Sequence, residues 1–442
     1  MSERAVESGR AAGGGALGNG PIWLLLAALL GGTGARLWLI AHAAPPDYAI
    51  DGLFDRLAWN IASGAGFTLD GATPVAHYGP AYPGILAGIF YFAGHRPELI
   101  PYAHVLFDAL TGACIFFSAR LLFGSWVAAW AAAAVYLYPA YWTYDLRIRS
   151  ENLLTMLMAA WLWAAVCCAR FGQARMYALS GLLAGLALLC KPVVLPAALL
   201  LAVLPAIMSS TGRAVVPRLA LYVGCMLLVV LPWTVRNYNA FGMFLPVSAG
   251  MGQGLWTGSD PVSEGSYPMP PDREAQIWET AGITPLAYPH AMYEVSMDRV
   301  LRDKGWARIR AQPGRYARLT ATRIVHFWIG NRMYLANSEH RFADGWRRDV
   351  AERGILVALY SVAKRLLLIP VALVLAAWAG WRFRSRWREM LPLYVLPVGV
   401  TLGYVPFAVE SGRYALPVLP CVFILAVVAV AQRVKSVQSR RS

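Results

Sequence analysis

The sequence has few charged residues. Asp, Glu, Lys and Arg make up 14% of its 442 residues, whereas 58% are hydrophobic and the mean hydropathy is +0.48. A soluble domain carries about a quarter charged residues, so this chain cannot cover a water-facing globule of its size. The composition therefore excludes an ordinary soluble protein and indicates a membrane protein.

Acidic residues are scarcer than basic ones, and the formal net charge is +15. Such an excess is also found in nucleic-acid-binding proteins, but in a membrane protein with many spans Lys and Arg usually mark the cytoplasmic loops. We therefore expect membrane lipids as partners and no nucleic acid.

The signatures of metal sites, disulfides and nucleotide-binding loops are missing. The six cysteines all lie in apolar stretches without metal-ligand spacing. The Gly-rich run at 248–256 follows no predicted strand and lacks a Gly-Lys-Ser ending, so we interpret it as a flexible outer turn. The seven histidines are scattered, and no Ser/His/Asp constellation is legible. We expect no cofactor, and nothing in the sequence supports a divalent metal.

What the sequence has instead is a series of apolar stretches near the length of about 20 residues that a membrane-spanning helix needs. They number about ten, and the one at 196–208 is short. The stretches lie at residues 21–42, 102–123, 126–144, 153–169, 177–194, 196–208, 219–235, 366–381, 390–409 and 416–431.

Basic residues in alternate connections give the orientation. They occur near Arg120, between Arg170 and Arg175, between Arg213 and Arg218, and from Arg382 to Arg388. Short cytoplasmic loops carry Lys and Arg, so both termini are predicted to be cytoplasmic and the number of spans to be even.

This topology divides the chain into five parts. We expect catalytic residues in the outer loops of the first membrane module, because exposed loops commonly carry function. The parts are a flexible cytoplasmic tail at 1–20, a transmembrane module at 21–235 with outer loops at 43–101 and 145–151, a periplasmic loop or cap at 236–364, C-terminal transmembrane helices at 365–432, and a basic cytoplasmic tail at 433–442.

Three segments of the outer loops have local patterns. Residues 53–61 carry apolar side chains at helical spacing, which predicts an amphipathic helix lying flat at the outer surface. Residues 82–93 are apolar but too short to span, which predicts an interfacial or re-entrant segment. Residues 308–323 form a basic amphipathic stretch within the cap.

Acidic residues at the membrane face are the first candidates for chemistry, because a dehydrated carboxylate is costly without a role or partner. Asp51 opens the predicted interfacial helix, although it could be a plain N-cap. Glu151 lies at the outer entrance of a span, where it could instead face the helix dipole or pair with Arg147 or Arg149. Asp55 shares a helix face with Asp51, so a metal or a basic side chain should compensate the like charges, although Asp55 could equally be a solvated surface residue.

Basic residues at the same level form a second group. An anionic lipid headgroup is the natural partner of Lys191, which could alternatively snorkel to the interface. Arg236 and Arg413 lie at the outer ends of spans and suit bidentate phosphate contacts. Each could also anchor a helix end, and Arg413 could pair with Glu410.

Several of these segments, in this order, resemble the GT-C membrane glycosyltransferases. The similarity is to the bacterial branch that includes protein O-mannosyltransferases and lipid A aminoarabinose transferase. It covers most of the chain, and its motifs are specific through their order and topology. The segments are Asp51 followed by Leu57-Ala58-Trp59-Asn60-Ile61-Ala62-Ser63-Gly64-Ala65-Gly66-Phe67, then Gly79-Pro80-Ala81-Tyr82-Pro83, Tyr138-Pro139, Ser150-Glu151-Asn152-Leu153, Lys191-Pro192, Pro232-Trp233-Thr234-Val235-Arg236-Asn237-Tyr238 and Arg413-Tyr414-Ala415-Leu416-Pro417.

The resemblance implies an all-α, polytopic GT-C-type bundle of about ten transmembrane helices. It also implies interfacial helices in the first outer loop and a larger outer loop between spans 7 and 8. The implied enzyme moves a sugar from a polyprenyl-phosphate donor to a glycan, lipid or protein acceptor on the periplasmic face of a bacterial inner membrane.

The same resemblance assigns roles to individual residues. Asp51 and Glu151 would be the catalytic carboxylates, with Asp51 as general base and inversion at the anomeric carbon. Donor phosphate-binding residues would be Lys191, Arg236, Arg413 and Arg149, and substrate-lining residues would be Asp55, Tyr82 and Tyr414. The sequence departs from the family pattern in having Asp55 in place of an aromatic residue and Glu410 in place of a His.

A transporter or lipid-linked glycan flippase is the main alternative, because intramembrane Lys and Gly/Pro-rich helices also occur in carriers. Carriers commonly have repeated halves, and no such repeat is legible here. A non-catalytic scaffold in envelope assembly is the third possibility.

Overall fold

The computed structural model of the chain describes residues 19–42, 48–208, 212–260, 295–329, 367–407 and 412–441, together with Ile355, Leu359 and Ala363. Regular structure within these residues is helical, apart from one isolated β-bridge between Thr68 and Pro74. The all-α fold class expected from the sequence is therefore confirmed. Most of the tail predicted at 1–20 and much of the cap predicted at 236–364 lie outside the described residues.

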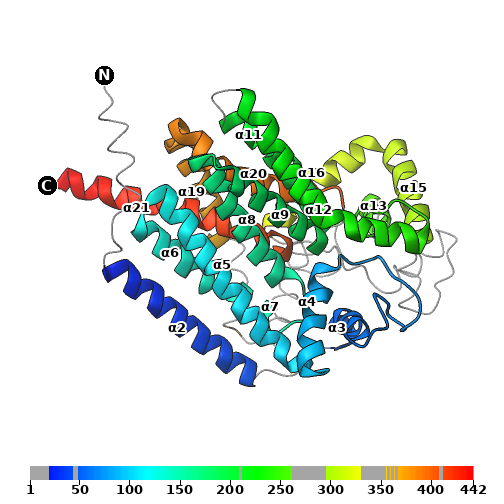
Figure 1. Cartoon of the computed structure of the whole chain (residues 1–442). Helices are drawn as coiled ribbons and strands as arrows, with labels where there is room; N and C mark the ends of the chain where they lie inside the picture. Colours follow the sequence, from blue (N-terminus) through cyan, green and yellow to red (C-terminus); the bar gives the residue numbers. More distant parts are fainter. Residues whose placement is uncertain are drawn as a thin grey trace.

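The long apolar helices run side by side in a tilted bundle (Figure 1). Five helical stretches of the described residues are long and apolar enough to cross a membrane, and shorter apolar helices accompany them. The exact number of spans stays a prediction. The helices of the bundle are α2 (Asn19–His42), α5 (Ile100–Phe123), α6 (Ser125–Tyr136), α8 (Glu151–Phe171), α9 (Ala174–Cys190), α10 (Leu195–Ala202), α11 (Leu204–Met208), α12 (Val215–Phe241), α19 (Ile369–Arg382), α20 (Trp387–Tyr404) and α21 (Leu419–Arg441).

Helix α8 lies at the centre of the bundle. Its apolar window is 78% buried, whereas that of α2 at the bundle edge is 17% buried. The indole of Trp161 in α8 is fully enclosed and donates a hydrogen bond to the Ser180 hydroxyl of α9 at 3.1 Å. A buried indole N–H needs such a partner. Helix α8 is therefore a rigid support for Glu151, which stands at its first position.

Helices α9 and α12 pack with their backbones in close contact. A Cβ atom at Gly181 of α9 would lie 2.1 Å from the carbonyl oxygen of Tyr222 in α12. Small residues allow such close helix contacts in membrane proteins. This glycine therefore fixes the distance between the two helices that carry Lys191 and Arg236 at their ends.

The two ends of the bundle carry different elements. At one end lie α3 (Tyr48–Ala62), α4 (Ala81–Ala93), α13 (Met251–Ser259) and α15 (Val295–Ala311), whereas the start of α2, the end of α21 and the turn from α19 to α20 lie at the other (Figure 1). We call the first end the α3 end. The basic α19–α20 turn, predicted to be cytoplasmic, thus lies opposite the predicted outer loops.

The first outer loop contains the two helices that the sequence indicates. Helices α3 and α4 pack together, and Phe54 of α3 contacts the rings of Tyr78 and Tyr82 at centroid distances of 4.6 and 5.1 Å. Helix α3 begins at Tyr48, so Asp51 lies in its first turn and neither opens the helix nor occupies the N-cap. The interpretation of Asp51 as a plain cap is therefore wrong.

Proline breaks two of the predicted spans. Helix α6 ends at Tyr136, and a separate helix, α7 (Pro139–Asp145), follows it, so the stretch at 126–144 is not one helix. The residue before a proline is driven out of the helical region, and Tyr138 is extended at φ −71° and ψ 114°. The short stretch at 196–208 is likewise divided between α10 and α11.

The described part of the region at 236–364 corrects two further expectations. The Gly-rich run forms helix α13 instead of a flexible turn, and its backbone N–H groups at Gly250, Gly252 and Gln253 donate to one carboxylate oxygen of Asp298 at 2.8–3.2 Å. The basic stretch at 308–323 is interrupted, because α15 ends at Ala311 and α16 (Pro313–Ile329) begins at a proline.

Candidate active site

Glu151 is the centre of a buried charged cluster at the start of α8. Its side chain is 4% exposed. Its Oε1 accepts a hydrogen bond from Lys191 Nζ at 3.0 Å, and Arg413 Nε lies 3.7 Å from the same oxygen. Both contacts of Glu151 join segments that are distant in the sequence, and Glu410, which the sequence offers as a partner of Arg413, lies outside the described residues. The structure therefore brings together three of the predicted site residues.

Lys191 reaches Glu151 because α9 ends at the right place. Pro192 follows it and begins a short 3-10 helix, η2 (Pro192–Val194), and Lys191 itself is extended at φ −147° and ψ 115°. The residue before proline avoids the helical region, so the sequence Lys-Pro sets this break. The break turns the ammonium group toward the start of α8.

Tyr414 completes this group from η8 (Gly412–Val418), the 3-10 segment that also carries Arg413. Its ring stacks on Tyr404 at 4.4 Å between centroids and lies 5.8 Å from Lys191 Nζ. Arg413 donates from Nη2 to the Tyr414 hydroxyl at 3.3 Å. We call Glu151, Lys191, Arg413 and Tyr414 the Glu151 cluster.

The Glu151 cluster carries more positive than negative charge. One carboxylate faces the ammonium of Lys191 and the guanidinium of Arg413, and Arg149 adds a further attraction to Glu151. The second carboxylate oxygen of Glu151, Oε2, is buried and has no hydrogen-bond partner among the residues that the structure describes. A buried excess of cations is costly unless an anion accompanies it, so the cluster is suited to bind a phosphate group.

Asp55 has the basic partner that the sequence requires. Both of its carboxylate oxygens lie 3.0 Å from His95 Nε2, and Trp59 stacks on the His95 ring. Asp51 lies one turn earlier in the same helix, but its side chain lies outside the described residues. The contact between Asp51 and the Glu151 cluster that a shared site requires therefore stays a prediction.

Tyr82 lies inside the protein. It is fully buried, and its hydroxyl lies 2.9 Å from His104 Nε2, while His104 Nδ1 lies 3.0 Å from the carbonyl oxygen of Asp145. These contacts join α4 to α5 and α7. The predicted substrate-lining role of Tyr82 stays a prediction, and its buried contacts give it a packing role as well.

Arg236 holds the first outer loop against the end of α12. It donates to the carbonyl oxygens of Val75 and Phe67 at 3.0 and 3.3 Å, and its guanidinium lies 4.8 Å from the Trp233 ring. These contacts with the first outer loop are sufficient to explain an arginine at this position. Donor phosphate binding by Arg236 stays a prediction.

A second buried ionic cluster was missed by sequence reasoning. Arg36 of α2 is 1% exposed and pairs with Asp108 of α5 at 2.9 Å and with Asp145 of α7 at 2.8 Å. Asn152, next to Glu151, donates to both carboxylates at 3.3 and 2.8 Å. The available signal was the presence of Arg36 and Asp108 within apolar spans, where ionisable residues need partners.

Metal-ligating groups are not concentrated in the described part of the chain. Within those residues no group of three or more His, Cys, Asp or Glu side chains is arranged to hold a metal ion. The expectation that the reaction needs no cofactor remains a prediction.

Comparison with known proteins identifies the fold. Residues 77–235 match the family model described as dolichyl-phosphate-mannose-protein mannosyltransferase, and this range includes Glu151 and Lys191. No curated protein matches the chain.

Solved structures resemble the chain over nearly its whole length. The archaeal oligosaccharyltransferase AglB from Archaeoglobus fulgidus, in complex with an inhibitory peptide and a dolichol-phosphate, has a TM-score of 0.54 and 13% identity over 95% of this chain and 51% of AglB. A second Archaeoglobus fulgidus oligosaccharyltransferase structure, with Zn and sulfate, has a TM-score of 0.52 and 13% identity over 94% of this chain and 50% of that one. The chain thus spans about half the length of these relatives.

ArnT from Cupriavidus metallidurans, bound to undecaprenyl phosphate, is 17% identical over 94% of this chain and 79% of ArnT. Its TM-score of 0.42 is too low to support a conclusion. The two oligosaccharyltransferase matches show the fold, and the fold agrees with the one that the sequence motifs imply. The chain therefore shares the fold of the oligosaccharyltransferase AglB, and its residues 77–235 match the mannosyltransferase family model.

Proposed function

We propose that the protein transfers a sugar from a polyprenyl-phosphate donor to an acceptor at the α3 end of the bundle. The observation that carries this proposal is the Glu151 cluster, in which Lys191 and Arg413 converge on one buried carboxylate. The matched family acts, by its description, with a dolichyl-phosphate sugar, and AglB binds a dolichol-phosphate. The proposed location is the inner membrane of a bacterium, with the α3 end facing the periplasm.

Charge changes in the reaction fit the composition of the Glu151 cluster. A sugar linked to a polyprenyl phosphate is a phosphodiester with one negative charge, and the released polyprenyl phosphate is a monoester that carries more negative charge. Lys191 and Arg413 together exceed Glu151 by one charge. The cluster would therefore bind the donor and stabilise the charge that develops on the leaving phosphate.

The acceptor side of the reaction requires a base. Asp51 would accept the proton of an acceptor hydroxyl as its oxygen bonds to the anomeric carbon and the bond from that carbon to the phosphate oxygen breaks. One carboxylate base and no second nucleophile would give inversion. Glu151 would hold Lys191 and Arg413 in place and would act as a positioning residue.

Purified protein in lipid nanodiscs, supplied with radiolabelled polyprenyl-phosphate sugars and an envelope extract, tests the proposal. Wild type should form labelled glycoconjugate with inverted configuration, Asp51→Asn should form none, and Glu98→Gln should behave as wild type. Glu98 is a suitable control because it is an exposed carboxylate, paired at the surface with Arg96.

The carrier alternative predicts the opposite result in the same system. If wild type and Asp51→Asn form equally little product while the donor crosses sealed vesicles, the transferase proposal is wrong. A product that retains the donor configuration would contradict inversion alone.

A further inference from the structure

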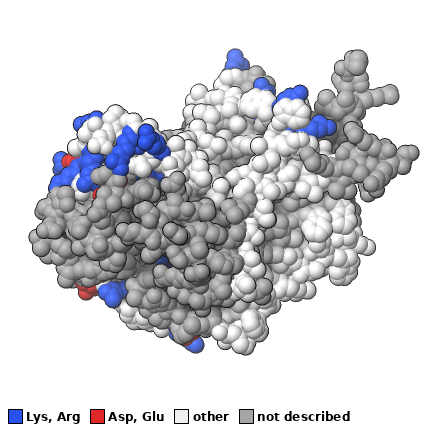
Figure 2. Space-filling model, turned by 180° about the vertical axis from the view of Figure 1, so that it is seen from behind, with Lys and Arg blue, Asp and Glu red and all other residues white. Residues whose placement is uncertain are grey.

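Basic residues accumulate on α15 and α16, where the membrane topology does not explain them. Residues 295–329 contain eight Lys and Arg but two Asp. Figure 2 shows Lys and Arg side chains on the surface formed by the two helices, although Arg323 is fully buried. Helix α15 lies at the α3 end, whereas Lys and Arg of short loops normally gather at the opposite, cytoplasmic side. An anionic partner on the outer side would account for them.

Both acidic residues of this segment already have partners. Asp298 accepts hydrogen bonds from the backbone of Gly250, Gly252 and Gln253 at the start of α13, and Asp303 lies 3.5 Å from Arg302. These contacts leave the surface of α15 and α16 with a strong excess of positive charge.

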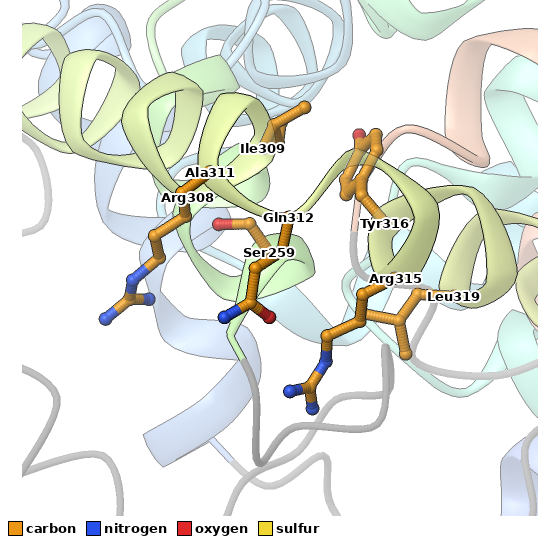
Figure 3. A pocket seen from close by; sticks show the side chains of 8 residues that line it. All are labelled: Ser259, Arg308, Ile309, Ala311, Gln312, Arg315, Tyr316 and Leu319. Carbon is orange, nitrogen blue, oxygen red and sulfur yellow. The ribbon is translucent and has the colours of Figure 1, made fainter.

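A cavity lies at the centre of this basic surface. It has a volume of about 200 Å³ and is formed where the end of α13 meets the turn between α15 and α16. Arg308, Gln312 and Arg315 extend to the same side of this turn, with Ser259 close behind them (Figure 3). Pockets that enclose a whole drug-sized ligand measure about 300–1,000 Å³, so this cavity suits one charged group of a larger molecule.

Arg308 is held in place at the edge of the cavity. Its guanidinium lies 3.3 Å from the centre of the Trp256 ring, and its Nη1 lies 3.5 Å from Asp260 Oδ2. Within the described part of the chain, Nη1 is buried and makes no hydrogen bond, so the nearby carboxylate does not satisfy it. A planar guanidinium fixed on an aromatic ring is well prepared to bind an oxyanion.

The cavity connects to the Glu151 cluster through one side chain. Tyr316 lines the cavity, and its hydroxyl donates to the carbonyl oxygen of Pro406 at 2.5 Å. Pro406 follows the end of α20, where Tyr404 stacks on Tyr414 of the cluster. The wall of the cavity that Tyr316 forms is therefore joined to the end of α20, two residues beyond Tyr404.

We propose that this cavity binds the acceptor and that the acceptor is an anionic saccharide. Arg308 and Arg315 bind its phosphate or carboxylate group, and Gln312 and Ser259 bind neighbouring hydroxyl groups. A saccharide fits better than a lipid bilayer surface, because the cations line a cavity together with hydrogen-bonding side chains. Binding at this site stands by itself, whereas its role as acceptor site rests on the proposed transferase function.

Titration calorimetry on the full-length protein, in nanodiscs of uncharged lipid and without donor, tests the binding. The probes are tri-galacturonate and phosphorylated maltotriose, with maltotriose as the uncharged counterpart. We expect both anionic probes to bind, the neutral one to bind at least about tenfold more weakly, and added salt to weaken the anionic probes.

Two double variants separate the cavity from the surrounding charge. Arg308→Gln with Arg315→Gln should reduce anionic binding at least about tenfold. Arg299→Gln with Arg318→Gln removes the same charge from exposed positions of the same helices, outside the cavity, and should leave binding within about twofold.

Three results would overturn the inference. The first is equal affinity for the neutral and the anionic probes. The second is an equal loss of affinity for the anionic probes in the two double variants. The third is tighter binding to vesicles of anionic lipid than to the anionic saccharides, with that binding lost when Arg308 and Arg315 are replaced. Transfer to a neutral acceptor with no anionic binding would leave the proposed function standing without this site. Binding of the anionic probes without any transfer would leave this site standing and would contradict the proposed transferase function.

Discussion

At the scale of single residues, Glu151 illustrates how a carboxylate becomes part of a cationic site. A buried carboxylate is costly alone, and here Lys191 and Arg413 from distant segments compensate it. The pair with Lys191 is buried on the carboxylate side, 4% exposed, and more open on the ammonium side, 21% exposed. The open side is where a ligand can approach.

Replacement of Lys191 should weaken donor binding. We expect Lys191→Ala to lower the affinity for polyprenyl phosphate by about 10- to 100-fold, because a hydrogen-bonded charge is lost, and Lys191→Arg to retain part of it. Binding of fluorescent polyprenyl phosphate to the purified variants measures this. Arg175→Ala, an exposed cation that bonds only locally to Gln173, is the control. Unchanged affinity in Lys191→Ala would remove this residue from the site.

Replacement of Glu151 should lower the rate of transfer without lowering the affinity for the donor phosphate. Glu151→Gln removes the one negative charge of the cluster, so affinity for polyprenyl phosphate should stay equal or rise, while transfer falls because Lys191 and Arg413 lose the group that positions them. Affinity and initial rate are measured on the same preparation. A large loss of affinity would show that Glu151 contributes to donor binding in another way.

At the scale of helices, buried polar contacts attach the edge of the bundle to its centre. Helices α2 and α12 are the most exposed of the long apolar helices. Arg36 attaches α2 to α5 and α7. The guanidinium also lies 4.1 Å from the Tyr136 ring, and Thr33 shares a 2.6 Å hydrogen bond with the Tyr136 hydroxyl. Asn152 extends this network to the start of α8.

Arg36 should be less replaceable than either of its partners. Arg36→Met leaves two buried carboxylates without a cation and should cost about 3–5 kcal/mol, whereas Asp145→Asn leaves one carboxylate per guanidinium and should cost clearly less. Thermal unfolding of the detergent-solubilised protein compares the two variants. Equal destabilisation would contradict this account of the cluster.

Close packing of α9 on α12 should depend on Gly181. Gly181→Ala places a methyl group against the Tyr222 carbonyl and should cost about 1–3 kcal/mol through displacement of the helices. Gly224→Ala is the matched control on α12, because a Cβ there would meet no heavy atom within 4 Å. A lower midpoint of thermal unfolding for Gly181→Ala alone is expected, and an equal midpoint for the two variants would contradict the close contact.

At the scale of the whole molecule, the side chains of the proposed sites collect toward one end of the bundle. Helices α3, α4 and α15 lie at the α3 end (Figure 1), and a Cβ atom at Gly79, just before α4, would lie 2.1 Å from the carbonyl oxygen of Leu189, two residues before Lys191. Lipid-linked substrates can diffuse in the bilayer to such an end, while water-soluble groups reach it from outside. The arrangement suits a reaction between a membrane-bound donor and a polar acceptor.

Replacement of Asp51 should abolish catalysis without affecting the folding of the molecule. Asp51→Asn should leave expression and thermal stability nearly unchanged while transfer is abolished, because a base acting in the transition state contributes little to ground-state packing. Size-exclusion profiles and unfolding midpoints accompany the transfer assay. A marked loss of stability would instead indicate a structural role for Asp51 in α3.

The class of fold and most residues of the candidate site could be predicted from local features of the sequence. Apolar stretches, proline positions and the motif order indicated a helical membrane bundle. Glu151, Lys191 and Arg413 were selected from their local sequence, and Tyr414 from the family resemblance. These features depend on composition and short spacing, which one segment of chain contains on its own. The Lys-Pro break is such a local feature.

Which of these residues meet depends on how the helices pack against one another. The contacts from Glu151 to Lys191 and Arg413 cross between helices, as do those from Arg36 to Asp108 and Asp145. Asp298 likewise crosses from α15 to cap the Gly-rich start of α13, which turned an expected loop into a helix. Such pairings are set by the packing of whole helices, and that packing has no signature in any single stretch of sequence.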